Sequence, residues 1–287
     1  MSETNTGGMT GPGNQETQTF YKAWQEEEHV DHFGAWDRYS ASTLIRICSR
    51  FNDCQLFEEL PDDAYQTLSD VGCANGRFYR YFSGIRPKLE YKGFDLSRVA
   101  IERAKTLNPK GDFNEFNGDP SSDSRLPSDI VFCRDVVHHQ TNPKEFLSSL
   151  YNSADKYLIL RVRTREAGPT EFDPTASCQY AYGQWVPYIV FNTQELIDLF
   201  RSFDPAPVSI KIRQHPVVLG GWAGRYLPKE LYQPETRTAE SGVIIEKGSA
   251  SGSSEPSVTI ETQPEIYIQS RRRRLLNLLG RGWLAGI

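Results

Sequence analysis

The sequence contains little cysteine, and no two cysteines have the spacing of a metal site. The five cysteines are odd in number and scattered, at Cys48, Cys54, Cys73, Cys133 and Cys178. A zinc finger needs close pairs such as Cys-x-x-Cys, and a disulfide framework needs an even set. We therefore expect no structural metal and no disulfide framework, and we predict a reducing compartment, the cytoplasm.

Long apolar runs and an excess of positive charge are also missing. No apolar run approaches the roughly 18 residues of a membrane-spanning helix, and the N-terminus lacks the basic and apolar regions of a signal peptide. The chain has 32 Lys and Arg residues against 37 Asp and Glu residues, which gives a net charge of −5. This balance disfavours a general nucleic-acid-binding protein.

The composition changes along the 287 residues and suggests four segments. Gly, Ser, Thr, Pro and Gln are abundant near both ends, where too little apolar surface is available to offset the entropy of ordering the chain. We predict a disordered tail over 1–18, a helical cap over 19–65 and the main domain over 66–247. Residues 248–287 should form a flexible linker and a basic, then apolar, C-terminal tail.

Strand-like and helix-like stretches alternate from residue 66 onward. This alternation predicts an α/β fold, with a seven-stranded, mostly parallel sheet that is covered by helices on both faces. The last two strands follow each other without a helix, so we expect an antiparallel strand at the end of the sheet. Two insertions, an irregular one over 164–191 and a long loop over 215–241, interrupt the pattern. Strands are predicted over 66–73, 89–96, 112–118, 128–137, 156–163, 208–214 and 242–247, and helices over 76–85, 97–107, 143–154 and 193–203.

Ligands of open α/β sheets bind beyond the carboxyl ends of the strands, so the residues that follow each strand are informative. After the first strand, the small residues Gly72, Ala74 and Gly76 allow a ligand to approach the backbone. The third glycine of a dinucleotide fingerprint would fall at Arg77, which disfavours pyrophosphate binding. The Asp70 carboxylate would instead attract an ammonium or sulfonium group.

Acidic residues also follow the next two strands. Asp95 lies nineteen residues after Gly76, a spacing typical of a carboxylate that accepts hydrogen bonds from ribose hydroxyls. Asp119, followed by Pro120, could accept a hydrogen bond from an exocyclic amine such as that of adenine. Together the three acidic positions predict a nucleoside-containing ligand with an amino-acid end.

From about residue 66 to 247, the chain resembles the class I S-adenosylmethionine-dependent methyltransferases, which have a Rossmann-like fold. The resemblance rests on Asp70-Val71-Gly72-Cys73-Ala74-Asn75-Gly76, Phe94-Asp95-Leu96-Ser97, Asn117-Gly118-Asp119-Pro120, Asp129-Ile130-Val131-Phe132-Cys133 and the His138-His139 pair. It implies that S-adenosylmethionine is the cofactor. By this resemblance Asp70 and the glycines hold the methionine part, Asp95 the ribose and Asp119 the adenine, and Ala74 departs from the usual glycine. The implied cofactor-binding residues are Asp70, Gly72, Ala74, Gly76, Asp95, Leu96, Asp119, Pro120 and Arg134.

The acceptor side is less defined by the sequence. Residues 182–192 loosely resemble a subgroup of uncharacterised small-molecule or sugar methyltransferases. His138 and His139 follow the fourth strand, where the transferred methyl group should lie, and either histidine could take a proton from an acceptor hydroxyl. The methyl-transfer rate would then fall at low pH through a pKa near ~6.5. Alternatively, the histidines pack beneath the cofactor, and alignment of the two reactants supplies most of the catalysis.

Aromatic residues of the N-terminal helices and of the insertions are candidates for the acceptor pocket, or for the cores of those segments. They are Trp24, Trp36, Tyr182, Trp185, Tyr188 and Trp222.

Two further groups of residues have alternative interpretations. Arg161, Arg163 and Arg165 alternate along one strand, so they share a face and either bind an anionic acceptor group or form ion pairs. His29 and His32 could ligate a metal, but no further ligand cluster accompanies them, and a charged surface segment or a contact with the substrate is favoured.

The C-terminal sequence RRRRLLNLLGRGWLAGI combines four arginines with an apolar run. Residues 271–284 could bind a membrane surface or a protein partner, or dock on the chain's own core.

These observations predict a methyltransferase that methylates an oxygen atom of a small-molecule acceptor. Two alternatives remain: a methyltransferase that acts on RNA or protein, and a non-catalytic interaction protein that retains the fold.

Overall fold

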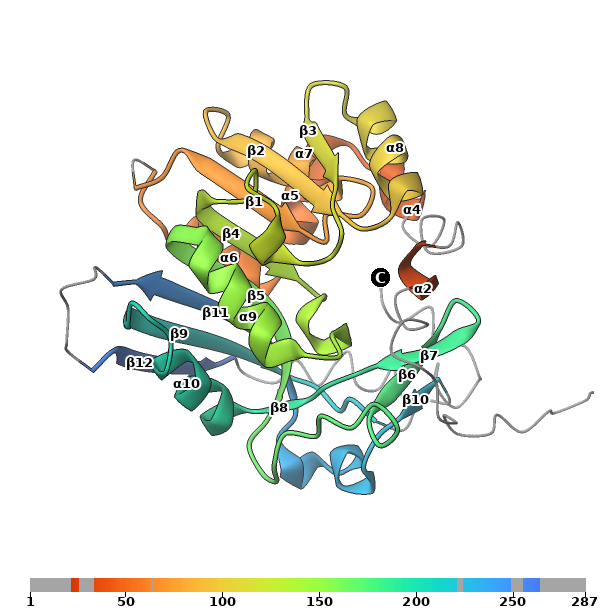
Figure 1. Ribbon diagram of the computed structural model, residues 1–287, viewed down its shortest axis with the longest axis vertical. Helices are drawn as coiled ribbons and strands as arrows, with labels where there is room; N and C mark the ends of the chain where they lie inside the picture. The colour runs from red at the N-terminus through yellow and green to blue at the C-terminus, as the bar shows by residue number, and fades with distance from the viewer. Residues whose placement is uncertain (1–21, 26–33, 63, 221–223, 249–254, 264–287) are drawn as a thin grey trace, which may run out of the picture.

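In the computed structural model, residues 22–25, 34–62, 64–220, 224–248 and 255–263 are described. They form a nine-stranded sheet with helices on both faces and a small three-stranded sheet beside it (Figure 1). The expected segments 1–18 and 271–284, together with His29, His32 and Trp222, lie outside the described residues. No described helix is both long and apolar enough to cross a membrane.

The central sheet has the strand order β12-β9-β11-β5-β4-β1-β2-β3, and β8 also pairs with β5. Its strands are β1 (Thr67–Val71), β2 (Glu90–Asp95), β3 (Asp112–Glu115), β4 (Ser128–Arg134), β5 (Ala154–Arg165), β8 (Phe191–Asn192), β9 (Pro207–Pro216), β11 (Ala239–Lys247) and β12 (Ser257–Thr262). The predicted mostly parallel α/β fold is confirmed, with nine strands rather than seven. The strand order reverses beside β1, whose neighbours are β2 and β4, and this is where ligands of such sheets bind.

Alternating side chains of the central strands divide the core into two layers. Ile130 and Phe132 of β4 pack on one side, and Val131 and Cys133 pack on the other. The first side is covered by α5 (Ala41–Cys48), α6 (Asn52–Glu58), α7 (Arg77–Ile85) and α8 (Arg98–Leu107), and the second by α9 (Pro143–Ser153) and α10 (Thr193–Arg201). Thus α5 and α6, which belong to the expected helical cap, cover a face of the sheet.

Local sequence signals set the helix starts. The Ser97 side chain accepts a hydrogen bond from the Ala100 N–H at the start of α8, the helix predicted over 97–107. The Asn192 side chain accepts from the Gln194 and Glu195 N–H groups at the start of α10. These caps satisfy backbone donors that have no partner within the helix.

Two expectations about the strands are wrong. The antiparallel strand was expected at the end of the sheet, but it is β11, which lies inside the sheet between β5 and β9. The chain forms the outer strand β9 first and then returns to insert β11 next to β5. The segment predicted as a flexible linker includes β12, which extends the sheet by parallel pairing with β9.

The insertion over 164–191 is also more regular than expected. It contains the hairpin of β6 (Cys178–Ala181) and β7 (Gln184–Pro187), to which β10 (Arg225–Tyr226) adds a third strand. The hairpin turn is formed by Tyr182 and Gly183, which both have positive φ, at +47° and +85°. Two residues of this conformation match the twist of a tight hairpin.

Short helices complete the described chain. They are α2 (Lys22–Gln25), α4 (Gly34–Asp37) and the 3₁₀ turns η1 (Pro120–Ser122), η2 (Val137–His139), η3 (Lys229–Tyr232) and η4 (Pro234–Thr236). Of these, α2 and η2 contribute side chains to the cavity described next.

Candidate functional site

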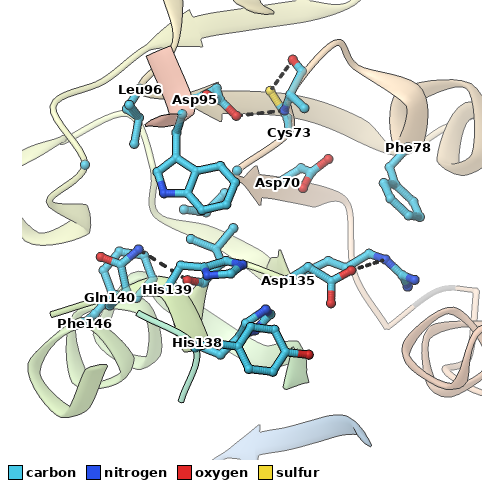
Figure 2. Close-up of a pocket in the computed structure, with 18 of the residues that line it drawn as sticks. Asp70, Cys73, Phe78, Asp95, Leu96, Asp135, His138, His139, Gln140 and Phe146 are labelled. Carbon is cyan, nitrogen blue, oxygen red and sulfur yellow. Dashed lines mark hydrogen bonds and ion pairs between the residues drawn. The ribbon is translucent and has the colours of Figure 1, made fainter. Parts of the chain in front are cut away.

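A cavity of about 290 Å³ lies at the carboxyl ends of β1, β2 and β4. Figure 2 shows Asp95 on one side of this cavity, His138 and His139 on the other, and Asp70 between them. The two insertions also reach the cavity, through Gln179, Tyr182, Tyr188 and Arg225. Residues that are far apart in the sequence therefore line one cavity.

The turn after β1 forms the floor of the cavity. The N–H groups of Gly72 and Cys73 both donate to the Phe94 carbonyl, at 2.8 and 3.1 Å, which ties this turn to β2. Gly72 has φ +83°, and a Cβ atom there would lie 2.2 Å from Val136 Cγ2. Glycine is thus required at position 72 by both backbone conformation and space.

Ala74 and Gly76 continue this turn with positive φ, at +47° and +75°. Ala74 lines the cavity and keeps a left-handed conformation that is uncommon for a residue with a side chain. Gly76 precedes α7 and packs under Phe113, so its role is to shape the turn.

Asp70 is buried and accepts a 2.6 Å hydrogen bond from the Tyr91 hydroxyl. Burial raises the pKa of the Asp70 carboxyl to about 7, although the Tyr91 bond acts in the opposite direction. A carboxylate at the wall of this cavity would be stabilised by a positively charged ligand group.

Asp95 lies at the end of β2 and is held by two backbone donors. Its Oδ2 accepts from the Ala74 N–H at 2.8 Å, and its Oδ1 accepts from the Ser97 N–H at 2.9 Å. Burial raises the pKa of Asp95 to about 6. Leu96 also lines the cavity, so both residues expected at the end of β2, Asp95 and Leu96, are in its wall.

Asp119 and Pro120 are not on the cavity. The exposed Asp119 side chain accepts hydrogen bonds from the Ser121 N–H and hydroxyl, and it caps η1. Phe116 and Gly118 line the cavity nearby. Other residues of the predicted loop thus reach the cavity, while the Asp119 carboxylate is used in the local turn.

Arg134, at the end of β4, lines the cavity. Its guanidinium forms an ion pair with Asp53. Its Nη1 donates to both carboxylate oxygens of Asp53, at 2.5 and 2.6 Å, and its guanidinium lies 4.0 Å from the centre of the Phe51 ring. Asp53 lies on α6, so a helix of the expected cap helps to position a cavity residue.

Asp135 follows Arg134 with φ +59° and forms ion pairs with Arg161 and Arg163, each at 2.8 Å. Burial alone would raise the pKa of Asp135, but the Arg161, Arg163 and Arg134 charges hold it well below its usual range. Arg161, Arg163 and Arg165 were expected either to bind an anionic acceptor group or to form ion pairs. Ion pairs are observed for all three, since Arg165 pairs with Glu230. Arg163 also lines the cavity and donates to the Tyr188 hydroxyl at 3.0 Å.

His138 and His139 both line the cavity and are buried. The His139 Nδ1 lies 2.7 Å from the Pro187 carbonyl oxygen, so Nδ1 carries the proton and donates it there. No described residue forms a hydrogen bond with Nδ1 of His138. Burial lowers the pKa of His139 to about 4 and that of His138 well below its usual range, so the expected transition near 6.5 is not supported.

Several aromatic residues of the predicted pocket are in place. Trp24, Tyr182 and Tyr188 line the cavity, and the Trp24 ring centre is 4.6 Å from that of His139. Trp36 and Trp185 do not line it. Sequence reasoning missed Gln179 and Arg225, which are brought to the cavity by the pairing of β6 with β10, and no local pattern marks that pairing.

No group of metal-ligating side chains occurs among the residues that the structure describes. The five cysteines are all free and buried, which agrees with the absence of disulfide spacing in the sequence.

Comparisons with known proteins identify the fold of this region. Residues 69–155 match a family model described as a methyltransferase domain. Among curated proteins, no sequence matches this chain.

Two solved structures illustrate the structural similarity. Human N-acetylserotonin methyltransferase, crystallised with SAM, superimposes with a TM-score of 0.51 at 12% identity over 83% of this chain, which spans only 60% of that longer chain. The Burkholderia thailandensis 1,6-didemethyltoxoflavin-N1-methyltransferase, with bound 1,6-didemethyltoxoflavin and S-adenosylhomocysteine, has a TM-score of 0.50 at 15% identity and covers 84% of this chain and 94% of its own.

Proposed function

We propose, from the premise that this chain is a class I S-adenosylmethionine-dependent methyltransferase, that it methylates an oxygen atom of a small molecule. The observation that carries the proposal is the single cavity that joins the turn after β1, Asp95 and the two histidines. This arrangement supports the proposal, because a nucleoside-binding side and an acceptor side would then share one cavity.

The residues on the nucleoside-binding side fit S-adenosylmethionine. Gly72 leaves its backbone open beside the cavity, and the Asp70 carboxylate would hold an ammonium group there. Asp95 would accept hydrogen bonds from the ribose hydroxyls, since each of its carboxylate oxygens has further acceptor capacity. Phe116 and Gly118 would border the adenine. When bound, the cofactor supplies an electrophilic methyl group on a positively charged sulfur.

On the acceptor side, His138 and His139 would face the acceptor oxygen and exclude water from it. Trp24, Tyr182 and Tyr188 enclose this end with aromatic surface, which suits a small organic molecule. The low pKa of His139, about 4, keeps its ring neutral at physiological pH, so its Nε2 lone pair could accept a proton from an acidic acceptor.

The burial of both histidines favours a small acceptor over the alternative of RNA or protein, since a polymer would need an open groove. The net charge of −5 also offers no general attraction for RNA. The Burkholderia structure provides an example of the same fold with a small heteroaromatic molecule bound.

Two measurements on the intact chain test this proposal. Isothermal titration calorimetry should show binding of S-adenosylhomocysteine, and methyl-labelled S-adenosylmethionine should label small molecules from fractionated extracts. Mass spectrometry and NMR of the labelled products would identify the methylated atom. A methyl ether or a methyl ester would support oxygen, whereas an N-methyl or S-methyl product would contradict the proposal. No binding of S-adenosylhomocysteine would favour the non-catalytic alternative, and labelling confined to RNA or protein would favour the macromolecular one.

A further inference from the structure

Charged residues are distributed unevenly around the cavity. Two of its three lining carboxylates, Asp70 and Asp95, belong to β1 and β2, on the nucleoside-binding side. The third, Asp135, forms ion pairs with Arg134, Arg161 and Arg163. Behind the cavity, Asp53 also pairs with Arg134, and Glu240 pairs with Arg161 and Arg163. Four arginines line the cavity: Arg77, Arg134, Arg163 and Arg225.

Two of these arginines act directly on the histidines. The positive charges of Arg163, from β5, and Arg225, from β10, add to burial in lowering the pKa of His139. Both also lower the pKa of His138, for which burial and His139 are larger causes, and only Asp135 among the facing charges opposes them. Two guanidinium groups therefore line the acceptor end of the cavity beside the histidines.

Arg77 is a further buried guanidinium at the cavity. Burial, followed by the charge of Arg134, lowers the pKa of the Arg77 guanidinium to about 10. Its guanidinium carbon lies 4.9 Å from the centre of the Trp36 ring and 5.1 Å from that of Phe78. Burial alone disfavours a charged guanidinium, so the lowered pKa reflects this apolar packing first.

Arg225 is held in a defined orientation by the small sheet. Its Nε donates to the Gln179 side-chain oxygen at 2.9 Å, and its Nη1 donates to the Leu219 carbonyl at 3.2 Å. The guanidinium carbon lies 4.3 Å from the centre of the Tyr188 ring, and the same ring is 5.2 Å from that of His138. The small sheet thus fixes a positive charge beside the histidines.

His138 contributes an unsatisfied polar atom to this end of the cavity. Its side chain is 1% exposed, and no described residue bonds its Nδ1. Because an unpaired buried polar atom is costly, a ligand that completes this hydrogen bond is favoured.

We propose that the acceptor is an oxyanion, the conjugate base of a phenol, an enol or a carboxylic acid, rather than an alcohol or an amine. This inference rests on the proposed methyltransferase function and names the substrate class of the same site. Arg163 and Arg225 stabilise the negative charge, and His138 donates a hydrogen bond to it.

The chemistry of methyl transfer agrees with this assignment. The acceptor oxygen contributes the electron pair of the new O–CH₃ bond, while the carbon–sulfur bond breaks and its electron pair goes to sulfur. No proton is released in this step, so no strong base is needed. An alcohol would require a base that takes its proton, which imidazoles of such low pKa do poorly, and a protonated amine would be repelled by the arginines.

The test compares benzoate with benzamide, which has nearly the same shape without the charge. Histidine resonances of ¹⁵N-labelled protein saturated with S-adenosylhomocysteine are followed by NMR. We expect benzoate to shift the His138 and His139 resonances, to raise the pKa of both rings, and to bind at least about tenfold more tightly than benzamide. In Arg225→Gln this preference should decrease, because only Arg163 of the two arginines remains, whereas it should persist unchanged in the control Arg98→Gln, because Arg98 is an exposed residue of α8.

Equal or tighter binding of benzamide would overturn the oxyanion assignment, as would histidine resonances that respond to neither compound. Binding of S-adenosylhomocysteine is measured separately by calorimetry. If that ligand fails to bind, the proposed function fails, whereas the preference for benzoate over benzamide can still be read in the protein alone.

Discussion

Asp53 and Arg134 form an ion pair that is closed to solvent, with side chains that are 0% and 5% exposed. The pair joins α6 to the end of β4, across 81 residues of sequence. Arg134 at the same time borders the cavity, so the N-terminal segment is coupled to the candidate active site through this contact.

Replacing Asp53 by Ala should destabilise the protein by about 3–5 kcal/mol, because the Arg134 charge would remain buried without its partner. Urea denaturation measures the change. The matched control is Asp62→Ala, which removes the 79%-exposed partner of Arg86 and should cost at most about 1 kcal/mol. Equal losses of unfolding free energy in the two variants would show that the buried pair stabilises the protein no more than the exposed pair.

Gly72→Ala should damage the cavity floor. Its backbone, at φ +83°, costs an alanine about 1–2 kcal/mol, and the new Cβ would meet Val136 at 2.2 Å, which adds about 1–3 kcal/mol of overpacking. Gly183→Ala is the control, since φ is +85° there and no atom lies within 4 Å of the new Cβ. We expect thermal unfolding to show the larger loss for Gly72→Ala and a partial recovery in Gly72→Ala/Val136→Ala. A loss no larger than that of Gly183→Ala would exclude the steric contribution.

The sequence predicted best what is encoded locally. The strands β1, β2, β4 and β5 and the starts of α8 and α10 lie close to the predicted ranges. The capping side chains of both helices are adjacent in sequence to the helix that they start. By contrast, the apolar alternation of β12 is limited to Val258 and Ile260 and lies beside a Gly- and Ser-rich stretch. Its place depends on pairing with β9 and on the bonds from Arg213 to Glu261.

The candidate site shows the same division between local and long-range information. Asp70, Gly72 and Asp95 follow strands directly, and the sequence located them. Arg225 reaches the cavity through the pairing of β10 with β6. Arg225 and its partner Gln179 are 46 positions apart in the sequence. The depressed pKa values of the histidines arise from burial in the folded chain and had no counterpart in the sequence.

Asp95→Ala should weaken binding of S-adenosylhomocysteine by about 10–150-fold, the loss of roughly 1.5–3 kcal/mol from charge-assisted hydrogen bonds. In the wild type, affinity should also fall as the pH drops through about 6, where the carboxylate becomes protonated. Calorimetry between pH 5 and pH 8 checks both. Asp119→Ala serves as the control, because Asp119 caps η1 away from the cavity and its loss should change affinity little. A strong loss of affinity in Asp119→Ala would restore the adenine role that the resemblance implied.

Asp70 should make the protein less stable as the pH rises. Its folded-state pKa of about 7 exceeds the ordinary value of 3.8, so the folded state retains a proton that the unfolded state releases between these values. The loss of stability across this range is on the order of 4 kcal/mol, and Asp70→Asn should remove it. Urea denaturation at pH 4.5 and pH 7.5 gives the difference, with the exposed Asp155→Asn as control. A constant difference between Asp70→Asn and wild type at both pH values would contradict the raised pKa.

His139 should have the opposite effect on the acid side. Burial lowers its folded-state pKa to about 4, below the ordinary 6.5, so the unfolded state binds a proton that the folded state excludes in this range. Stability should therefore fall as the pH drops from 6.5 to about 4, by an amount on the order of 3 kcal/mol. His139→Asn removes the titrating ring but keeps an N–H donor near the Pro187 carbonyl, so the variant should fold and lose this part of the acid sensitivity.

The control is His215→Asn on β9, away from the cavity, which should follow the wild type in urea denaturation at pH 4.5 and pH 7. If His139→Asn and His215→Asn respond identically to acid, His139 is not held neutral by its surroundings. Its ring would then titrate like a solvent-exposed histidine.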